Sequence, residues 1–174
     1  VQKENNRYAL SKEQIRMITT ASALHDIGKI SIPDEILNKP GRLTAEEFAV
    51  IKGHSMAGAN MLSELPLDQK EEPLVKTAYE ICRWHHERYD GGGYPDGLKG
   101  EEIPVSAQVV ALADVYDALT SERCYKDAYS HEKAIEMILA GQCGAFNPLM
   151  LECLLDISSS LKKKMGYKSK ERYE

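Results

Sequence analysis

The stretch HHERYDGGGYP, residues 85–95, constrains the fold of this chain most strongly, and it begins with two adjacent histidines. Three consecutive glycines allow backbone conformations that other residues avoid, so the histidines join a tightly specified loop. A second adjacent pair of polar residues stands in the stretch ALHDIGK. Four of the five histidines fall in or between these motifs: His25, His54, His85 and His86. This concentration predicts a metal site and, with it, hydrolytic chemistry.

The size and composition of the chain indicate one compact domain. Its 174 residues, 43% of them hydrophobic, are enough to bury a core. No run of about 18 apolar residues occurs and no signal-peptide pattern opens the chain, so we expect no membrane span. The chain starts at Val1 rather than at methionine, which indicates a fragment. The four cysteines lack CxxC spacing, which is typical of reduced, mostly buried thiols in a cytoplasmic protein and argues against a thiolate zinc site.

The charge of the chain is unevenly distributed. The net charge is -5, but residues 161–174 carry six Lys and Arg and two Glu, so residues 1–160 sum to -9. An acidic body argues against non-specific binding of nucleic acid. We therefore expect a domain over residues 1–160 and a basic C-terminal tail over residues 161–174. The tail is more typical of a solvated, frayed terminus than of a basic interaction arm.

Helical periodicity runs through almost the whole chain, and no sustained period-2 alternation indicates a strand. Capping residues and prolines predict where helices begin. The expected starts lie at or near Ser11, Thr44, Leu74, Pro104, Ser130 and Asn147. There are no internal repeats and no linker. The fold class predicted is all-α, as a single compact helical domain.

The helix that follows Thr44 carries one apolar line. Phe48, Ile51, Ser55 and Leu62 share a face at helical spacing.

Two adjacent pairs of candidate ligands suggest more than one metal ion. Neighbouring residues of a helix project about 100° apart, so each pair spreads its ligands and suits two neighbouring ions better than one. His54 lies in the intervening helix, and Asp114 follows in ALADVYDALTS. Either Asp26 or Asp114 could bridge two ions through its two oxygens. Imidazole and carboxylate ligands without thiolate favour iron, manganese or zinc, and ions about 3.5–4 Å apart suit phosphodiester cleavage.

Ordinary structural roles compete with these assignments. A lone histidine such as His54 is more often packed or exposed than a ligand. His131 follows a helix cap without a neighbouring ligand, and we assign it a structural role. Asp117 lies on a different face from Asp114 and suits an ordinary polar contact. Burying Asp114 in an apolar helix is costly without a cation beside it, which favours a ligand role there.

Taken in order, these motifs resemble the HD-GYP family, the bacterial cyclic-dinucleotide phosphodiesterases within the HD superfamily of metal-dependent phosphohydrolases. The matching stretches are HDIGKISIPDEILNKPGRLT, HHERYDGGGYPDGLKGEEIP, ALADVYDALTSERCYK and GAFNP. The resemblance covers nearly the whole chain and implies a helical domain of the HD type. It also implies a set of metal ligands: His25, Asp26, His54, His85, His86 and Asp114.

The resemblance further implies an activity. It is the metal-dependent hydrolysis of cyclic di-GMP to pGpG, to GMP or to both, with two or three divalent ions. Iron or manganese is favoured, with zinc, nickel or magnesium as alternatives. Lys29, facing the scissile phosphate, and Asp26 are the implied catalytic residues. Arg123 and Lys126 match positions that grip substrate phosphates, and Tyr94 is a further candidate for substrate contact.

Two departures from the family pattern stand out. The family has a further glutamate and histidine on a helix that precedes Ser11, and this chain starts too late to contain them, as in an N-terminally truncated domain. Asn147 stands where the family commonly has aspartate, although asparagine caps a helix equally well. The resemblance also implies an upstream sensory or receiver domain, and contact of the GYP loop with GGDEF-type proteins.

Two other functions stay open from the sequence. Within the same enzyme class, the substrate could be another cyclic dinucleotide, such as hybrid cyclic GMP-AMP. Outside it, the domain could be a catalytically silent receptor that binds a cyclic dinucleotide or a diguanylate cyclase. The intact set of ligands argues against the silent receptor.

Overall fold

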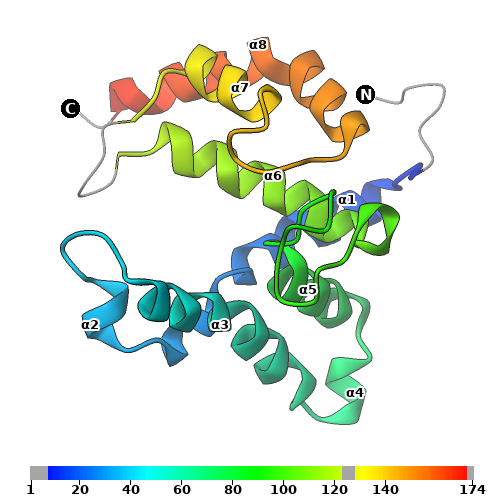
Figure 1. Cartoon of the computed structure of the whole chain (residues 1–174). Coiled ribbons are helices and arrows are strands. Elements are labelled where there is room, and N and C mark those ends of the chain that lie inside the picture. Colours follow the sequence, from blue (N-terminus) through cyan, green and yellow to red (C-terminus); the bar gives the residue numbers. More distant parts are fainter. Residues whose placement is uncertain (1–7, 123–127, 172–174) are drawn as a thin grey trace.

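The computed structural model describes residues 8–122 and 128–171, with only the backbone described for residues 165–171. Within these ranges all regular structure is helical and no strand occurs (Figure 1), so the predicted all-α class is confirmed. The helices are α1 Lys12–Ala21, η1 Ser22–Leu24, η2 Ile27–Ser31, α2 Asp34–Leu37, α3 Ala45–Ser63, α4 Leu67–Lys70, α5 Pro73–Trp84, η3 Gly100–Glu102, α6 Val105–Thr120, α7 His131–Leu139 and α8 Pro148–Glu171; the three η elements are 3-10 helices. None of the described helices combines the length and apolar character needed to cross a membrane.

Side-chain caps fix several helix starts where the sequence predicts them. The Ser11 hydroxyl accepts a hydrogen bond from the Gln14 N–H, and the Gln14 side chain accepts one from the Ser11 N–H. Thr44 and Glu47 form the same reciprocal pair at the start of α3. The Ser130 hydroxyl accepts from the backbone at the start of α7. Each cap satisfies backbone donors that the first turn of a helix leaves unpaired.

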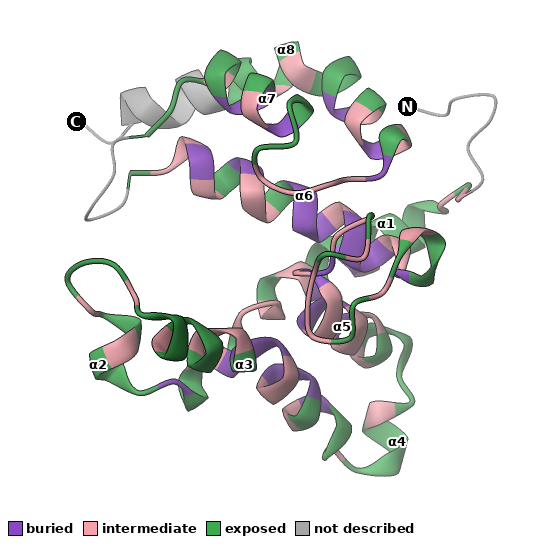
Figure 2. Ribbon diagram, viewed as in Figure 1, coloured by how far each residue is buried: buried purple, intermediate pink, exposed green. Residues whose placement is uncertain are grey.

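The helices enclose two hydrophobic cores that share α6. The first core lies among α1, α3 and α5, and Val110 of α6 contributes to it. The second lies among α6, α7 and α8 and contains Leu112 and Leu119. Figures 1 and 2 show α6 running between these two layers, with buried residues along much of its length. Because α6 belongs to both cores, it holds Asp114 at a fixed place relative to α3 and α5.

One expectation about local structure is wrong, and one apolar line of the sequence is only partly buried. Phe48 is 46% exposed, although Ser55 and Leu62 of the same line are buried. The buried residues of α3 begin only at His54, and Phe48 lies in the turns before it. His25 and Asp26 do not stand in a regular α-helix but between the 3-10 helices η1 and η2.

Asn147 caps α8 as predicted and also links distant parts of the chain. Its Oδ1 accepts a hydrogen bond from the Leu149 N–H at 2.9 Å. Its Nδ2 donates to Gln108 of α6 at 2.9 Å and to the Tyr8 hydroxyl at 2.8 Å. An aspartate could cap α8 but could not donate these two bonds. The asparagine therefore joins α6, α8 and the N-terminal end of the described chain.

The three described cysteines are free thiols. Cys82 is fully buried, whereas Cys143 and Cys153 are only half-buried. The expectation of buried thiols is confirmed for Cys82 and is only partly met by the other two. Cys124 lies outside the described residues.

Candidate metal centre

The end of α5 places two histidines in the interior. Ala78, Ile81 and Cys82 are fully buried and fix the inner face of this helix. His85 caps its C-terminus and is only 1% exposed. The His85 Nδ1 lies 2.8 Å from the carbonyl oxygen of Ile81. His86 follows directly, and the centroids of the two rings are 4.0 Å apart.

Helix α3 brings a third imidazole to the same place. His54 is 1% exposed, and its Nε2 lies 3.4 Å from the Nε2 of His85. One ring nitrogen from each of His54, His85 and His86 lies within 4.8 Å of the others, a spacing that could hold a metal ion. These three residues form the inner half of the site.

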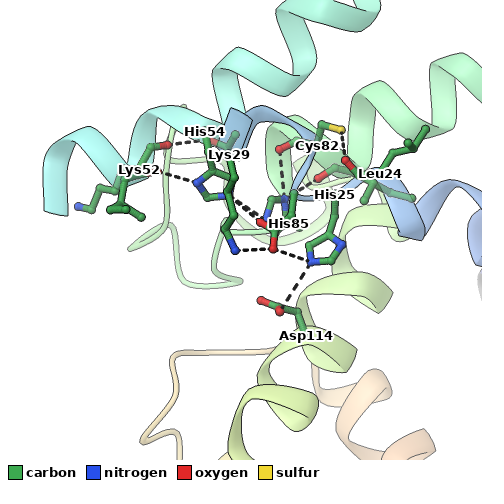
Figure 3. A network of polar contacts seen from close by, with 12 residues as sticks. Leu24, His25, Lys29, Lys52, His54, Cys82, His85 and Asp114 are labelled. Atoms are coloured by element: carbon green, nitrogen blue, oxygen red, sulfur yellow. Dashed lines mark hydrogen bonds and ion pairs between the residues drawn. The ribbon is translucent and has the colours of Figure 1, made fainter. Parts of the chain in front are cut away.

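The outer half is made of His25 and Asp26, from the segment between η1 and η2, and of Asp114 from α6. The His25 Nε2 lies 3.3 Å from Asp26 Oδ2 and 3.8 Å from Asp114 Oδ1. Figure 3 shows Asp114 reaching toward His25 from α6, across from the 3-10 segment. All six candidate ligands therefore converge.

Asp26 joins the two halves. Its Oδ1 lies 3.3 Å from the Nε2 of His54, while its Oδ2 lies 3.3 Å from the Nε2 of His25. Ligand atoms bound at about 2.1 Å to one ion lie about 3–3.5 Å apart, so each oxygen sits at a distance suited to sharing an ion with its imidazole. Lys29 donates a hydrogen bond to the Oδ2 of Asp26. The carboxylate is thus placed where it could bridge two ions.

Backbone carbonyls orient three of the four imidazoles in the same way. The Nδ1 atoms of His25, His54 and His85 lie 2.8, 2.6 and 2.8 Å from carbonyl oxygens. A carbonyl only accepts, so each Nδ1 carries a hydrogen; in His54 and His85 this leaves the lone pair of Nε2 toward the centre, whereas the Nε2 of His25 faces the carboxylate of Asp26. Metal-binding histidines are held by this kind of second hydrogen bond, which fixes the tautomer and the ring orientation. The donor set therefore fits divalent metal ions.

The two halves differ in electrostatics. Burial lowers the pKa of His85 to about 4, and burial together with the neighbouring His85 and His54 lowers the pKa of His86 to about 2. Burial also lowers the pKa of His54. In contrast, the hydrogen bond to Asp26 raises the pKa of His25. Burial raises the pKa of Asp26, but the hydrogen bonds from His25 and Lys29 outweigh it and leave that pKa below its ordinary value.

Gly28 lets the outer half approach α3. A Cβ at this position would lie 1.9 Å from the carbonyl oxygen of His54 and 2.5 Å from the backbone nitrogen of Gly58. Both contacts are with helix backbone, which cannot move aside, so only glycine fits here. This close approach holds Asp26 within reach of His54.

Residues 91–97, called here the glycine loop, are held against the end of α5 by two sets of hydrogen bonds. The Glu87 Oε1 accepts hydrogen bonds from the N–H groups of Asp96 and Gly97 at 2.7 and 3.0 Å. The carboxylate of Asp96 accepts two from Arg83 and one from the indole of Trp84, between 2.7 and 3.0 Å. The backbone and the side chain of Asp96 are therefore both held.

Gly93 lies in the glycine loop that these hydrogen bonds hold, and it sets the position of the next residue, Tyr94. A Cβ at Gly93 would lie 2.4 Å from the Cα of Glu87, so the loop backbone runs directly against the start of the same motif. The next residue, Tyr94, stacks on His86 with centroids 4.8 Å apart and an interplanar angle of 27°. The loop thus forms a wall of the site, with an aromatic face against the inner half.

Some candidates from the sequence lie elsewhere or have other partners. The two ring nitrogens of His131 form hydrogen bonds with the hydroxyls of Tyr116 and Ser158, both at 2.8 Å, so His131 has the structural role expected. Asp117 is exposed and accepts a hydrogen bond from Ser121. Arg123 and Lys126 lie outside the described residues.

Sequence reasoning missed the residues that hold the glycine loop. Glu87 is 3% exposed, and among the described side chains its Oε2 is the buried oxygen without a hydrogen-bond partner. Its position directly after two candidate ligands was the available signal, since a carboxylate there is either a ligand or an anchor. The pairing of Arg83 with Asp96 spans 13 residues and had no local signal.

Comparison with known proteins shows the family of this chain. The family profile described as “HD domain” matches residues 2–146. The chain belongs to the HD domain family. This HD domain is 45% identical over 148 residues to a cyclic di-GMP phosphodiesterase of Vibrio cholerae, covering 85% of this chain and 30% of the relative. The predicted resemblance is confirmed.

Two further relatives of this HD domain carry related names. It is 43% identical to the cyclic di-GMP phosphodiesterase response regulator RpfG of Xanthomonas campestris, covering 90% of this chain and 40% of the relative. It is 42% identical to the 3'3'-cGAMP-specific phosphodiesterase 2 of Vibrio cholerae, covering 86% of this chain and 28% of the relative. The chain therefore spans only about a third of the length of the curated relatives it matches.

Proposed function

We propose that this HD domain hydrolyses the phosphodiester bonds of cyclic di-GMP in a metal-dependent reaction that yields pGpG, GMP or both. The observation that carries the proposal is the position of Asp26, whose two oxygens each lie 3.3 Å from a different imidazole. Such a carboxylate suits a pair of ions that act on one phosphodiester. The names of the relatives support the same reaction class.

We assign the six converging residues as ligands for two or three divalent ions. His25, Asp26, His54, His85, His86 and Asp114 offer nitrogen and carboxylate oxygen without thiolate. This donor set favours iron or manganese, with zinc, nickel or magnesium as alternatives. When bound, the ions supply the Lewis acidity that hydrolysis of a phosphodiester requires.

The protein side chains bind and orient the diester. Lys29, held by Asp26 and 41% exposed, places a positive charge at the open side of the centre, where a scissile phosphate can approach. Asp26 keeps that ammonium in place and presents both oxygens inward. We assign Arg123 and Lys126 to the phosphates and Tyr94 to substrate contact. These cations would favour an anionic substrate in a chain whose net charge is negative.

Cyclic GMP-AMP is the second candidate substrate. The observation that favours it is the 42% identity to a phosphodiesterase named for 3'3'-cGAMP. The metal chemistry is the same for both dinucleotides, because only one base differs.

The test is turnover of cyclic di-GMP and of 3'3'-cGAMP by the full chain, purified without oxygen and supplied with Fe(II) or Mn(II). The expected result is metal-dependent release of pGpG or GMP, measured by chromatography, and its loss on chelation. Asp117→Asn is a matched control, since it removes an exposed carboxylate from α6 outside the centre. Tight binding without turnover in metal-loaded protein would contradict the enzyme and favour a receptor.

Further assignments follow the same proposal. We place the domain in the cytoplasm, where cyclic dinucleotides act as signals, and expect GGDEF-type proteins to contact the GYP loop. An upstream sensory or receiver domain is part of the proposal for the whole protein. We keep residues 1–160 as the phosphohydrolase domain and residues 161–174 as a basic tail, although α8 runs across that division.

A further inference from the structure

A row of aromatic and cationic side chains leads away from the inner half of the centre along α3. It consists of Tyr94, Lys52 and Phe48, and is called here the aromatic strip. Tyr94 stacks on His86, the Lys52 ammonium lies 5.1 Å from the Tyr94 ring centroid, and the same ammonium lies 5.0 Å from the Phe48 ring centroid. A series of contacts of about 5 Å each therefore connects His86, a candidate metal ligand, with the exposed ring of Phe48.

Lys52 is positioned by the two rings rather than by an acid. Within the described part of the chain no carboxylate pairs with its ammonium, in contrast to Lys29 and Lys39, which contact Asp26 and Glu47. Lys52 and Phe48 are four residues apart and so lie on the same face of α3. In the view of Figure 3, Lys52 extends away from Lys29 and Asp114. The strip is thus a separate cationic position at the rim of the centre.

Phe48 belongs to neither of the two hydrophobic cores. Its ring is 46% exposed, at a turn of α3 that precedes the first buried residue of the helix. An exposed aromatic ring beside an unpaired cation is suited to a flat ligand with acceptor atoms at one edge. Nucleobases have this character: they stack on aromatic faces, and guanine offers the acceptors O6 and N7 on one edge.

We propose that the aromatic strip binds one guanine base of the cyclic dinucleotide: the base takes the place of the Lys52 ammonium over the Phe48 ring, and that ammonium moves to the edge of the base and donates to its O6 and N7. The inference rests on the proposed function and adds the residues that select the base. Adenine carries an amino donor where guanine has O6, so a lysine ammonium discriminates against it. The strip therefore makes this site prefer guanine over adenine at one position of the substrate.

The test compares Phe48→Leu, Phe48→Trp and Lys52→Gln with wild type in the full, metal-loaded chain. Substrates are cyclic di-GMP, cyclic di-AMP and bis(4-nitrophenyl) phosphate, a diester without a base. Val50→Ala and Lys76→Gln are matched controls, since they alter an exposed apolar residue of α3 and an exposed lysine of α5. Metal content and melting temperature are measured for every variant.

We expect Phe48→Leu to raise KM for cyclic di-GMP by about tenfold, because loss of one stacked base costs about that factor. Phe48→Trp keeps a stacking face and should stay close to wild type. Lys52→Gln should reduce the preference for cyclic di-GMP over cyclic di-AMP by about tenfold. For Phe48→Leu, the ratio of kcat/KM for cyclic di-GMP to that for the base-free diester should fall by a similar factor.

Failure of this inference differs from failure of the proposed function. If wild type hydrolyses cyclic di-GMP but Phe48→Leu and Phe48→Trp behave alike, or Lys52→Gln keeps the base preference, the strip is not a base site and the hydrolase assignment stands. If wild type binds cyclic di-GMP without hydrolysis, the same variants are compared by equilibrium dialysis against that ligand, with the same criteria. A wild-type chain that neither binds nor hydrolyses cyclic di-GMP overturns both proposals.

Discussion

The two halves of the centre contrast in burial and in chemistry. His54 and His85 are 1% exposed, whereas the side chains of His25 and Asp114 are 26% and 28% exposed. The inner half offers neutral imidazoles held by helix carbonyls, and the outer half offers carboxylates beside a histidine whose pKa is raised. The contrast teaches that a buried nitrogen-rich half and a more open oxygen-rich half can share one carboxylate; under the proposed function, the inner half would hold one ion firmly and the outer half would hold another on the side open to the substrate.

The largest expected effect comes from removing the shared group. In Asp26→Asn, one carboxylate oxygen is replaced by an NH2 group that cannot bind a cation and the negative charge is lost, so the two halves can no longer share this residue. We expect turnover of cyclic di-GMP to fall at least about a hundredfold and the metal content to drop. Steady-state kinetics with metal analysis provides the measurement, with Asp117→Asn as the control. Full metal content and turnover in Asp26→Asn would show that the two halves are not connected through this residue.

The second largest effect is expected from removal of the metal, which should lower the thermal stability of the domain. Ions that bind only the folded state stabilise it by mass action, by about 2.7 kcal/mol at a hundredfold excess over the dissociation constant. For a domain of this size, that corresponds to a decrease of about 5–10 °C in melting temperature on chelation. Calorimetry before and after chelation, with Mn(II) added back as the control, measures the difference. An unchanged melting temperature in protein of verified metal content would rule out a preformed inner site.

Single variants of each half should separate the two ions. His54→Ala removes a buried ligand of the inner half and should weaken its ion by about tenfold or more. Asp114→Asn alters only the outer half, so the inner ion should remain after desalting while the outer ion is lost. Metal stoichiometry by elemental analysis distinguishes these results. Equal losses in both variants would mean that the halves form one indivisible site.

The smallest effect is a difference in pH dependence. Protons compete with metal at a histidine below its pKa, so the raised pKa of His25 brings competition at higher pH than the pKa of about 4 at His85. As the pH falls below the raised pKa of His25, the affinity of the outer half for its ion should decrease by up to about tenfold per pH unit. Mn(II) titrations at several pH values measure this. The comparison is contradicted if the inner ion is released first.

The sequence predicted the helices well because their signals are local. The caps at Ser11, Thr44 and Ser130 are set by residues within a few positions along the chain, and the structure confirms them. The position of Phe48 could not be predicted in this way. Helical spacing assigns a residue to a face, but whether that face is covered depends on elements distant in sequence.

The same limit applies to the centre. The sequence by itself determined which side chains could act, since imidazoles and carboxylates in paired motifs define a donor set for divalent metals. Only the tertiary structure decided that the two oxygens of Asp26 face different imidazoles, that Gly28 packs on the backbone of α3, and that Glu87 holds the loop under Tyr94. The physical reason is that these contacts join segments that meet only when α3, α5 and α6 pack around shared cores, and no local pattern in the chain encodes that approach.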